Sequence, residues 1–172
     1  MQFKIGDKVV YPNHGLGVIE QIKIQDICGQ RMQFYQLHLQ ENNSTVLIPI
    51  QNTQAIGLRR IIDRKEVRGL MHSLQCANPE MMAACKEWKS RFKENTEKMK
   101  TGRISDVADV LKVLASINSR KALSFREKKM YDRARMLLVS EIAAAENSSD
   151  NLVEQKIDKA LLKAIGPFSG TA

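Results

Sequence analysis

The sequence predicts an α+β protein, in which a small Tudor-like or SH3-like antiparallel β barrel precedes a compact all-α bundle of about five helices. Five of the nine glycines and two of the four prolines come before residue 58, as expected where short strands alternate with turns. Residues 103–165 contain neither residue type, so nothing in that stretch interrupts a helix. We expect the β domain at 1–62, the helical domain at 63–166 and a tail at 167–172.

The β domain contains segments rich in Val, Ile, Tyr and Phe that alternate with polar residues, which is the pattern of half-buried strands. They are residues 8–12, 17–27, 31–40 and 44–50. The separators contain turn formers and are short enough to join antiparallel neighbours. They are Asn13-His14-Gly15, Cys28-Gly29-Gln30 and Asn42-Asn43-Ser44.

The last of these segments places a leucine next to a proline. Side chains alternate between the two faces of a strand, so Leu47 faces outward if Val46 and Ile48 face the core. Pro49 lacks the N–H that a central strand donates, which places this end of the segment near a sheet edge or at a strand terminus. Such an edge can attach another protein, although Leu47 can also pack beneath a loop.

Capping and stop signals divide the helical domain. We expect helices over about residues 63–76, 79–100, 105–118, 124–146 and 151–165. The signals are the capping boxes Asp63/Glu66 and Ser124/Glu127, the caps Asn78-Pro79 and Ser105, and the stops Gly102 and Gly166-Pro167. Apolar residues at helical spacing predict the core. They are Val107, Val110, Leu111 and Leu114 in the third helix and Met130, Ala134, Leu137, Leu138 and Ile142 in the fourth.

Positive charge is concentrated in one part of the chain. The net charge is +8, and residues 85–135, with 15 basic and seven acidic side chains, account for all of it. Such a surplus favours an acidic partner, with nucleic acid the first expectation.

Trp88 is the only tryptophan, and it stands in a run of basic residues. These are Lys86, Lys89, Arg91 and Lys93. An aromatic ring among cations suits a nucleic-acid surface. Helical periodicity alone favours a buried tryptophan instead, because Trp88 shares a stripe with Met81, Cys85, Phe92 and Met99.

A second group of cations lies at the start of the predicted fourth helix, and five basic residues fall within ten positions there. They are Arg126, Lys128, Lys129, Arg133 and Arg135. The group predicts either phosphate contacts or a solvated helix face. Phe125 beside it is either the apolar part of the same surface or a staple onto its own helix.

Several classes of function are not indicated. The odd number of cysteines argues against a disulfide framework and favours a reducing, cytoplasmic location. The N-terminus has no apolar signal region and no window approaches 18 apolar residues, so we expect no membrane contact. His72, Cys76 and Cys85 fit no common zinc spacing, and no catalytic motif is present. We therefore expect no metal, cofactor, small-molecule substrate or enzymatic activity.

Several stretches of the sequence resemble the CarD/CdnL family of bacterial transcription regulators. They are Phe3–Pro12 with His14-Gly15, Leu47-Ile48-Pro49, Gly57-Leu58-Arg59, Trp88–Phe92, Lys100-Thr101-Gly102 and Leu123–Met130. Together they span the chain to about residue 165, as in the short stand-alone form of the family.

The resemblance implies a Tudor-like domain that binds the RNA polymerase β subunit and a helical domain that binds promoter DNA at the upstream edge of the bubble. Leu47 and Pro49 match polymerase-contact positions. Trp88 matches a minor-groove wedge that keeps the promoter open, and the DNA-facing patch is completed by Lys89, Arg91, Lys93, Phe125, Lys128 and Lys129. Some members have arginine where this chain has Leu47, so an apolar contact is expected in place of a salt bridge.

The alternative interpretation is an RNA-binding or ribosome-associated protein, in which the barrel and the basic domain cooperate on folded RNA. The responding promoters, the direction of regulation, the controlling signal and the oligomeric state do not follow from the sequence.

Overall fold

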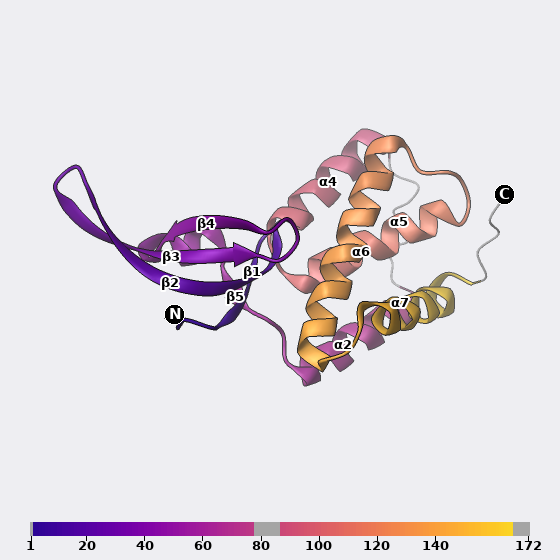
Figure 1. The fold of residues 1–172 in the computed structure, drawn as a ribbon. Coiled ribbons are helices and arrows are strands. Elements are labelled where there is room, and N and C mark those ends of the chain that lie inside the picture. Colours follow the sequence, from indigo (N-terminus) through magenta and orange to yellow (C-terminus); the bar gives the residue numbers. More distant parts are fainter. Residues whose placement is uncertain (1, 78–86, 167–172) are drawn as a thin grey trace. The chain divides into compact units, whose positions relative to one another are not determined.

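The computed structural model describes residues 2–77 and 87–166. The chain forms two units, Met1–Ile61 and Ile62–Ala172, each with its own hydrophobic core (Figure 1). The first unit contains the strands and the second contains the long helices, which confirms the predicted α+β class and its order along the chain.

The N-terminal unit is a five-stranded antiparallel sheet with the strand order β4-β3-β2-β1-β5. Its strands are β1 (Lys8–Tyr11), β2 (Gly15–Ile27), β3 (Gln30–Leu39), β4 (Ser44–Pro49) and β5 (Arg59–Arg60). A 3-10 turn, η1 (Ile50–Asn52), and a short helix, α1 (Thr53–Ile56), connect β4 to β5. The predicted segments therefore each form a strand, and the two edge strands are β4 and β5.

The core of the sheet consists of side chains that face inward at alternate positions along the strands. Fully buried side chains include Ile19, Leu37 and Ile48, one from each of β2, β3 and β4. The buried Tyr35 hydroxyl accepts a hydrogen bond of 3.0 Å from the Phe3 backbone N–H, and the two rings meet edge to face at 5.8 Å. The chain before β1 is thereby fixed to the sheet.

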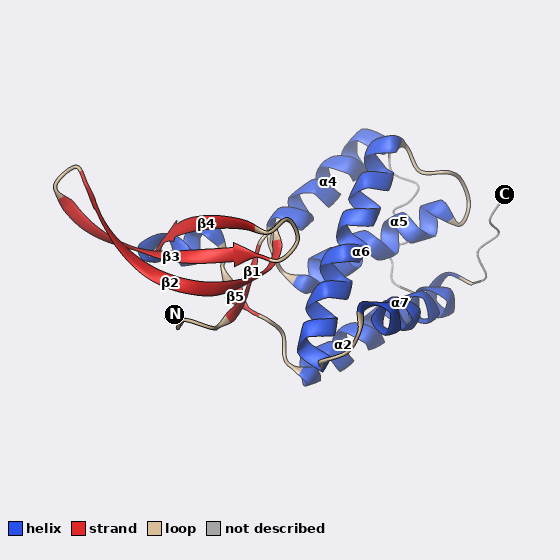
Figure 2. Cartoon of the chain, viewed as in Figure 1, coloured by secondary structure: helices blue, strands red, loops and turns tan. Residues whose placement is uncertain are grey.

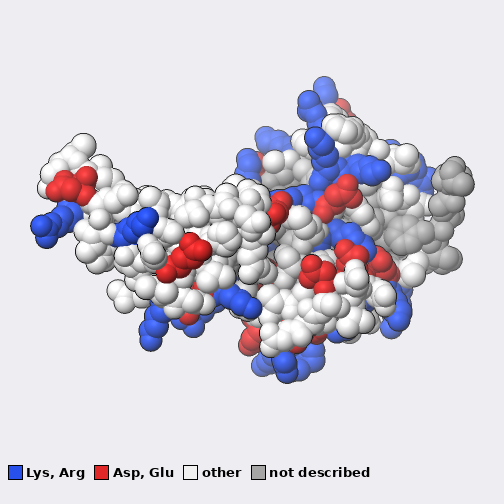
Figure 3. Space-filling view, in the orientation of Figure 1, with Lys and Arg blue, Asp and Glu red and all other residues white. Residues whose placement is uncertain are grey.

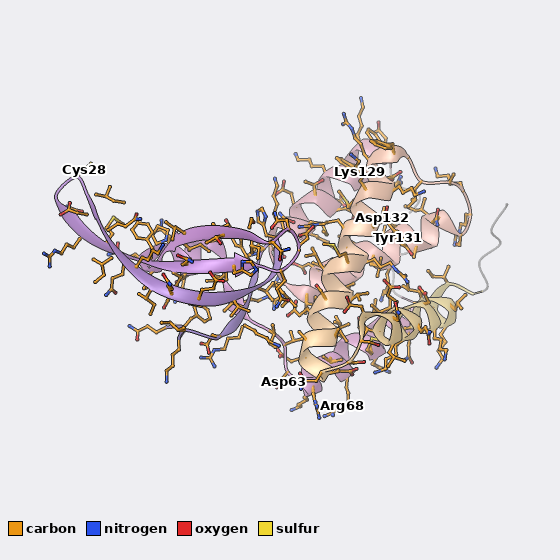
Figure 4. All side chains as sticks on the ribbon, viewed as in Figure 1. Cys28, Asp63, Arg68, Lys129, Tyr131 and Asp132 are labelled. Atoms are coloured by element: carbon orange, nitrogen blue, oxygen red, sulfur yellow. The ribbon has the colours of Figure 1, made fainter. Side chains whose placement is uncertain are left out.

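The β2–β3 hairpin extends beyond the other strands of the sheet (Figure 1). From Gln21 to Arg31 every side chain is exposed, on both faces of the two-stranded ribbon. The turn at its tip has positive φ at Cys28 (53°) and Gly29 (79°), as in a type I′ hairpin turn. Cys28 marks this tip in Figure 4.

The second unit contains five helices among the described residues (Figure 2). They are α2 (Arg64–Gln75), α4 (Trp88–Lys100), α5 (Ile104–Asn118), α6 (Phe125–Glu146) and α7 (Asp150–Ile165). Helix α5 is the central one, and its side chains from Val110 to Ile117 are all buried. The buried Lys112 of α5 donates hydrogen bonds to the carbonyls of Ser73 (2.7 Å) and Cys76 (3.0 Å), which closes the C-terminal end of α2.

Local signals predicted two helix starts correctly and one wrongly, and the start predicted at Asn78-Pro79 lies outside the described residues. Capping boxes open α2 at Asp63 and α6 at Ser124, as predicted. A continuous helix over 79–100 is wrong, because Glu87 has non-helical dihedral angles (φ −52°, ψ 137°) and α4 begins at Trp88. The rest of that prediction, 78–86, lies outside the described residues.

The third helix begins at Ile104 rather than at a Ser105 cap. The Asp106 carboxylate accepts hydrogen bonds from Thr101 Oγ1 (2.6 Å) and Arg103 Nε (2.9 Å). These bonds stabilise the first turn of the helix, which therefore begins before Ser105. No helix among the described residues is long and apolar enough to cross a membrane.

Candidate nucleic-acid and polymerase interfaces

Strand β4 presents Leu47 on the outer face of a sheet edge. Leu47 pairs with Gln36 of β3 and is 39% exposed, whereas the next residue, Ile48, is fully buried. Pro49 is half-buried at the end of the strand, opposite Phe34. The predicted edge position is confirmed by the strand order, and Leu47 does not pack beneath a loop. A contact with polymerase at this edge stays a prediction.

Trp88 is the first residue of α4 and lies at the surface, 37% exposed. Its indole stacks on the half-buried Phe92 ring, with 5.6 Å between ring centroids and 18° between planes. Its Nε1–H donates a hydrogen bond of 3.3 Å to Ser124 Oγ. The side chain is therefore held by one stacking contact and one hydrogen bond and remains partly exposed, which differs from the fully buried position that helical periodicity favoured.

The start of α6 places an aromatic ring and two cations beside this tryptophan. Phe125 is 74% exposed, so it does not serve as a staple onto its own helix. The Lys129 ammonium lies 4.6 Å from the centre of the Phe125 ring, within the range of a cation–π interaction. Lys128 is exposed next to it.

Arg91 corrects the sequence prediction of the DNA-facing patch. Its side chain is only 5% exposed, and its Nη2 lies 2.7 Å from Glu127 Oε1, with Nε at 3.2 Å from the same oxygen. Arg91 is three residues after Trp88, on the side of α4 that packs against α6. Its guanidinium is therefore a partner of a buried carboxylate and is not placed to contact a phosphate.

Glu127 stays ionised in this position. Burial alone would raise the pKa of its carboxyl group, but the hydrogen bonds from Arg91 and Ser124 outweigh burial and hold the pKa below its ordinary value. The second carboxylate oxygen accepts hydrogen bonds from Ser124 Oγ (2.8 Å) and Ser124 N (3.2 Å).

These contacts form a chain from Trp88 through Ser124 and Glu127 to Arg91, which we call the Trp88 support. It joins the N-terminal ends of α4 and α6, which lie side by side (Figure 1). The capping box of α6 is visible in the sequence, but its contact with a residue 36 positions earlier is not. Sequence reasoning therefore missed Ser124 and Glu127 as neighbours of the tryptophan.

Exposed cations surround this end of the helical unit, where Lys and Arg side chains project into solvent (Figure 3). They are Lys89, Lys93, Arg126, Lys128 and Lys129. Together with Trp88 and Phe125 we call them the basic aromatic patch. Arg135 of the predicted cluster lies elsewhere, because its guanidinium pairs with Asp158 of α7 (Nη2–Oδ2, 2.9 Å). That hydrogen bond raises the pKa of Arg135 further, despite partial burial.

No group of three or more potential metal ligands comes together within residues 2–77 and 87–166. His72 Nε2 lies 3.8 Å from Cys76 Sγ, and Cys85 lies outside the described residues.

Two family models match the chain, one in each unit. The CarD-like/TRCF RID domain matches residues 3–62, and the CarD C-terminal domain matches residues 70–158. The chain is 34% identical over 152 residues to a putative transcription factor, YdeB, of Bacillus subtilis (strain 168), covering 88% of this chain and 97% of that relative. A solved structure of CdnLNt from Myxococcus xanthus is 44% identical, covers 36% of this chain and 87% of its own, and has a TM-score of 0.32.

These matches define the chain as a two-domain transcription factor with a Tudor-like N-terminal domain. More particularly, it belongs to the CarD/CdnL family.

Proposed function

We propose that this chain binds the β subunit of RNA polymerase through the β4 edge and stabilises the open promoter complex through the basic aromatic patch. It acts in the cytoplasm, without catalysis or a cofactor. The observation that carries the proposal is the half-exposed Trp88 ring, held at the surface by Ser124 and flanked by exposed cations.

The patch has the composition of a surface that enters a minor groove. An apolar ring inserted between base steps unstacks them and kinks the duplex, at a cost of a few kcal/mol that added contacts repay. The Trp88 support lowers this cost, because the indole is already held in one orientation before DNA arrives. The surrounding lysines supply phosphate contacts without reading sequence.

Such contacts are weak by themselves, with dissociation constants of about 10⁻⁴ to 10⁻⁶ M at physiological salt. A second attachment to polymerase raises the effective concentration near promoter DNA. The β4 edge supports that role, since Leu47 is exposed and β4 is the terminal strand of the sheet in the described part of the chain, where another strand or an apolar contact can be accepted.

The half-life of open promoter complexes tests the proposal. We expect Trp88→Ala to shorten the half-life given by the wild-type chain while costing only about 1 kcal/mol of stability, because a half-exposed ring loses one stacking contact and one hydrogen bond. A fully buried tryptophan would cost roughly 3 to 5 kcal/mol. Thermal unfolding of the variant separates the two cases.

Leu152→Ala on α7, which removes a side chain that is 55% exposed, is the matched control and should leave the half-life unchanged. An unchanged half-life with Trp88→Ala would contradict the wedge role. Copurification of ribosomal RNA in place of polymerase would favour the RNA-binding alternative.

A further inference from the structure

A groove between α2 and α7 has a volume of about 440 Å³ and carries basic side chains along both sides. Arg68, with His72 beside it, comes from α2, and Lys156, Lys159 and Lys163 come from α7. This volume is within the range of about 300 to 1,000 Å³ that is common for binding clefts. The groove lies far along α6 from the basic aromatic patch, as the positions of Arg68 and Lys129 at opposite ends of the helical unit show (Figure 4).

Two acidic side chains of α7 interact with Arg135 of α6, whereas its basic side chains line the groove. Asp158 forms an ion pair with Arg135 of α6, and Glu154 also acts electrostatically on Arg135. The three lysines of α7 line the groove with α2, where Lys156 also pairs with Glu146 at the end of α6. The sequence does not reveal this arrangement, because residues 136–172 contain more acidic than basic side chains. The fold therefore creates a basic surface within a segment that is net acidic.

Most of this charge is not neutralised inside the groove. Glu146 is the one carboxylate among the described lining residues, and it already binds Lys156 at 2.6 Å. Within the part of the chain that the structure describes, Arg68, Lys159 and Lys163 have no ion-pair partner. Like charges on facing helices repel each other, so a partner that brings negative charge between them is favoured.

The floor of the groove selects among acidic partners. Its apolar lining consists of the half-buried Met71 and of Val67 and Ala160, each 1% exposed, with no aromatic side chain among the described residues. Bases of single-stranded nucleic acid bind mainly by stacking on aromatic rings, which this floor lacks. Aliphatic side chains fit it better, and methionine adapts its shape to them. An amphipathic helix presents such side chains along one stripe, with carboxylates on both flanks.

We propose that the α2–α7 groove is a second docking site, which binds an acidic amphipathic segment of a protein partner. The aliphatic stripe of the segment lies on the half-buried Met71 and on the aliphatic stems of the lysines, above the buried Val67 and Ala160. Its carboxylates meet Arg68 on one side and the α7 lysines on the other. The site is separate from the basic aromatic patch, so it allows the helical unit to hold a protein while it contacts DNA.

The test uses the ¹⁵N-labelled full-length chain and a synthetic 16-residue helical peptide with leucines at i, i+3, i+4 and i+7 spacing and glutamates on its flanks. We expect saturable amide shifts confined to α2 and α7. A peptide with the same composition in scrambled order is the control and should not produce them. Lys159→Glu with Lys163→Glu should weaken binding at least about tenfold, which corresponds to about 1.4 kcal/mol.

Arg68→Glu changes the α2 side of the groove and should also weaken peptide binding. Its effect would show that the loss in the lysine variant does not come from a local change in the structure of α7. Lys128→Glu with Lys129→Glu is the matched charge reversal in the basic aromatic patch and should leave peptide affinity unchanged. The absence of saturable shifts in α2 and α7 would overturn the proposal. A duplex of about 20 base pairs that shifts the same amides, with the loss confined to the groove variants, would assign the groove to nucleic acid instead.

Discussion

Arg91 and Glu127 form an ion pair that is almost completely removed from water. Removing two charges from water costs several kcal/mol per ion, and the cost is repaid only where the geometry is good and the remaining acceptors are satisfied. Here one Glu127 oxygen accepts from two Arg91 nitrogens and the other accepts from Ser124. The pair therefore fixes the first turns of α4 and α6 together.

Replacing only one member of the ion pair should destabilise the chain far more than replacing both members. We expect Arg91→Met to cost roughly 3 to 5 kcal/mol, because it leaves the Glu127 charge buried without its partner. Adding Glu127→Leu to Arg91→Met should restore part of that stability, since no buried charge remains. Urea unfolding of both variants measures the difference. Additive costs would show that the two side chains do not interact.

The same pair predicts a pH dependence. The pKa of Glu127 is lowered in the folded chain, so folding favours its ionised form. Its contribution to stability is complete above the ordinary carboxyl pKa of 4.5 and is lost as the pH falls through the lower folded pKa. The stabilities of the wild type and Arg91→Met should therefore converge as the pH falls below that range.

Individual elements differ in how much of them the sequence could predict. The capping boxes at Asp63 and Ser124 are local, since each involves a side chain and a backbone three residues away, and both were predicted correctly. The start of α4 has no side-chain cap at Glu87, so no local signal marked it. The burial of Arg91 depends on a carboxylate 36 residues away in sequence, which periodicity cannot show.

The β4 edge gives a prediction at the same scale. Leu47→Asp should abolish or strongly weaken capture of the polymerase β subunit, because it replaces an exposed apolar contact with a negative charge. Its effect on stability should stay within about 0.5 kcal/mol, as is usual for exposed positions. Ile5→Asp is the matched control, since Ile5 is 63% exposed and lies outside β4. Equal loss of polymerase capture in both variants would show that the β4 edge has no special role in binding.

Across the whole molecule, only part of the basic surplus is available to bind DNA. The segment that carries the surplus includes Arg91 and Lys112, which are buried, and Arg135, which is paired with Asp158. Counting charges along the sequence includes these cations in the surplus, because it cannot tell buried or paired side chains from exposed ones. The basic aromatic patch consists of the exposed remainder near the starts of α4 and α6.

The DNA binding of the basic aromatic patch can be tested by substitutions within the helical unit. Lys128→Ala with Lys129→Ala should weaken DNA binding about equally on unrelated sequences, because phosphate contacts do not read bases. The slope of log affinity against log salt concentration should flatten by about 1 to 2, at roughly 0.9 for each lost phosphate contact. Binding titrations at several salt concentrations on two duplexes measure both effects. Loss confined to one duplex would indicate base readout instead.

The long β2–β3 hairpin has a consequence for the dynamics of the N-terminal unit. Beyond Gln21 the ribbon has no core on either face, and an isolated two-stranded ribbon is only marginally stable in water. Its cross-strand amides should therefore exchange with solvent through local opening of the tip, while those beside Ile19 and Leu37 exchange only when the sheet unfolds. Tip fraying would thus leave β4 and its exposed leucine in place.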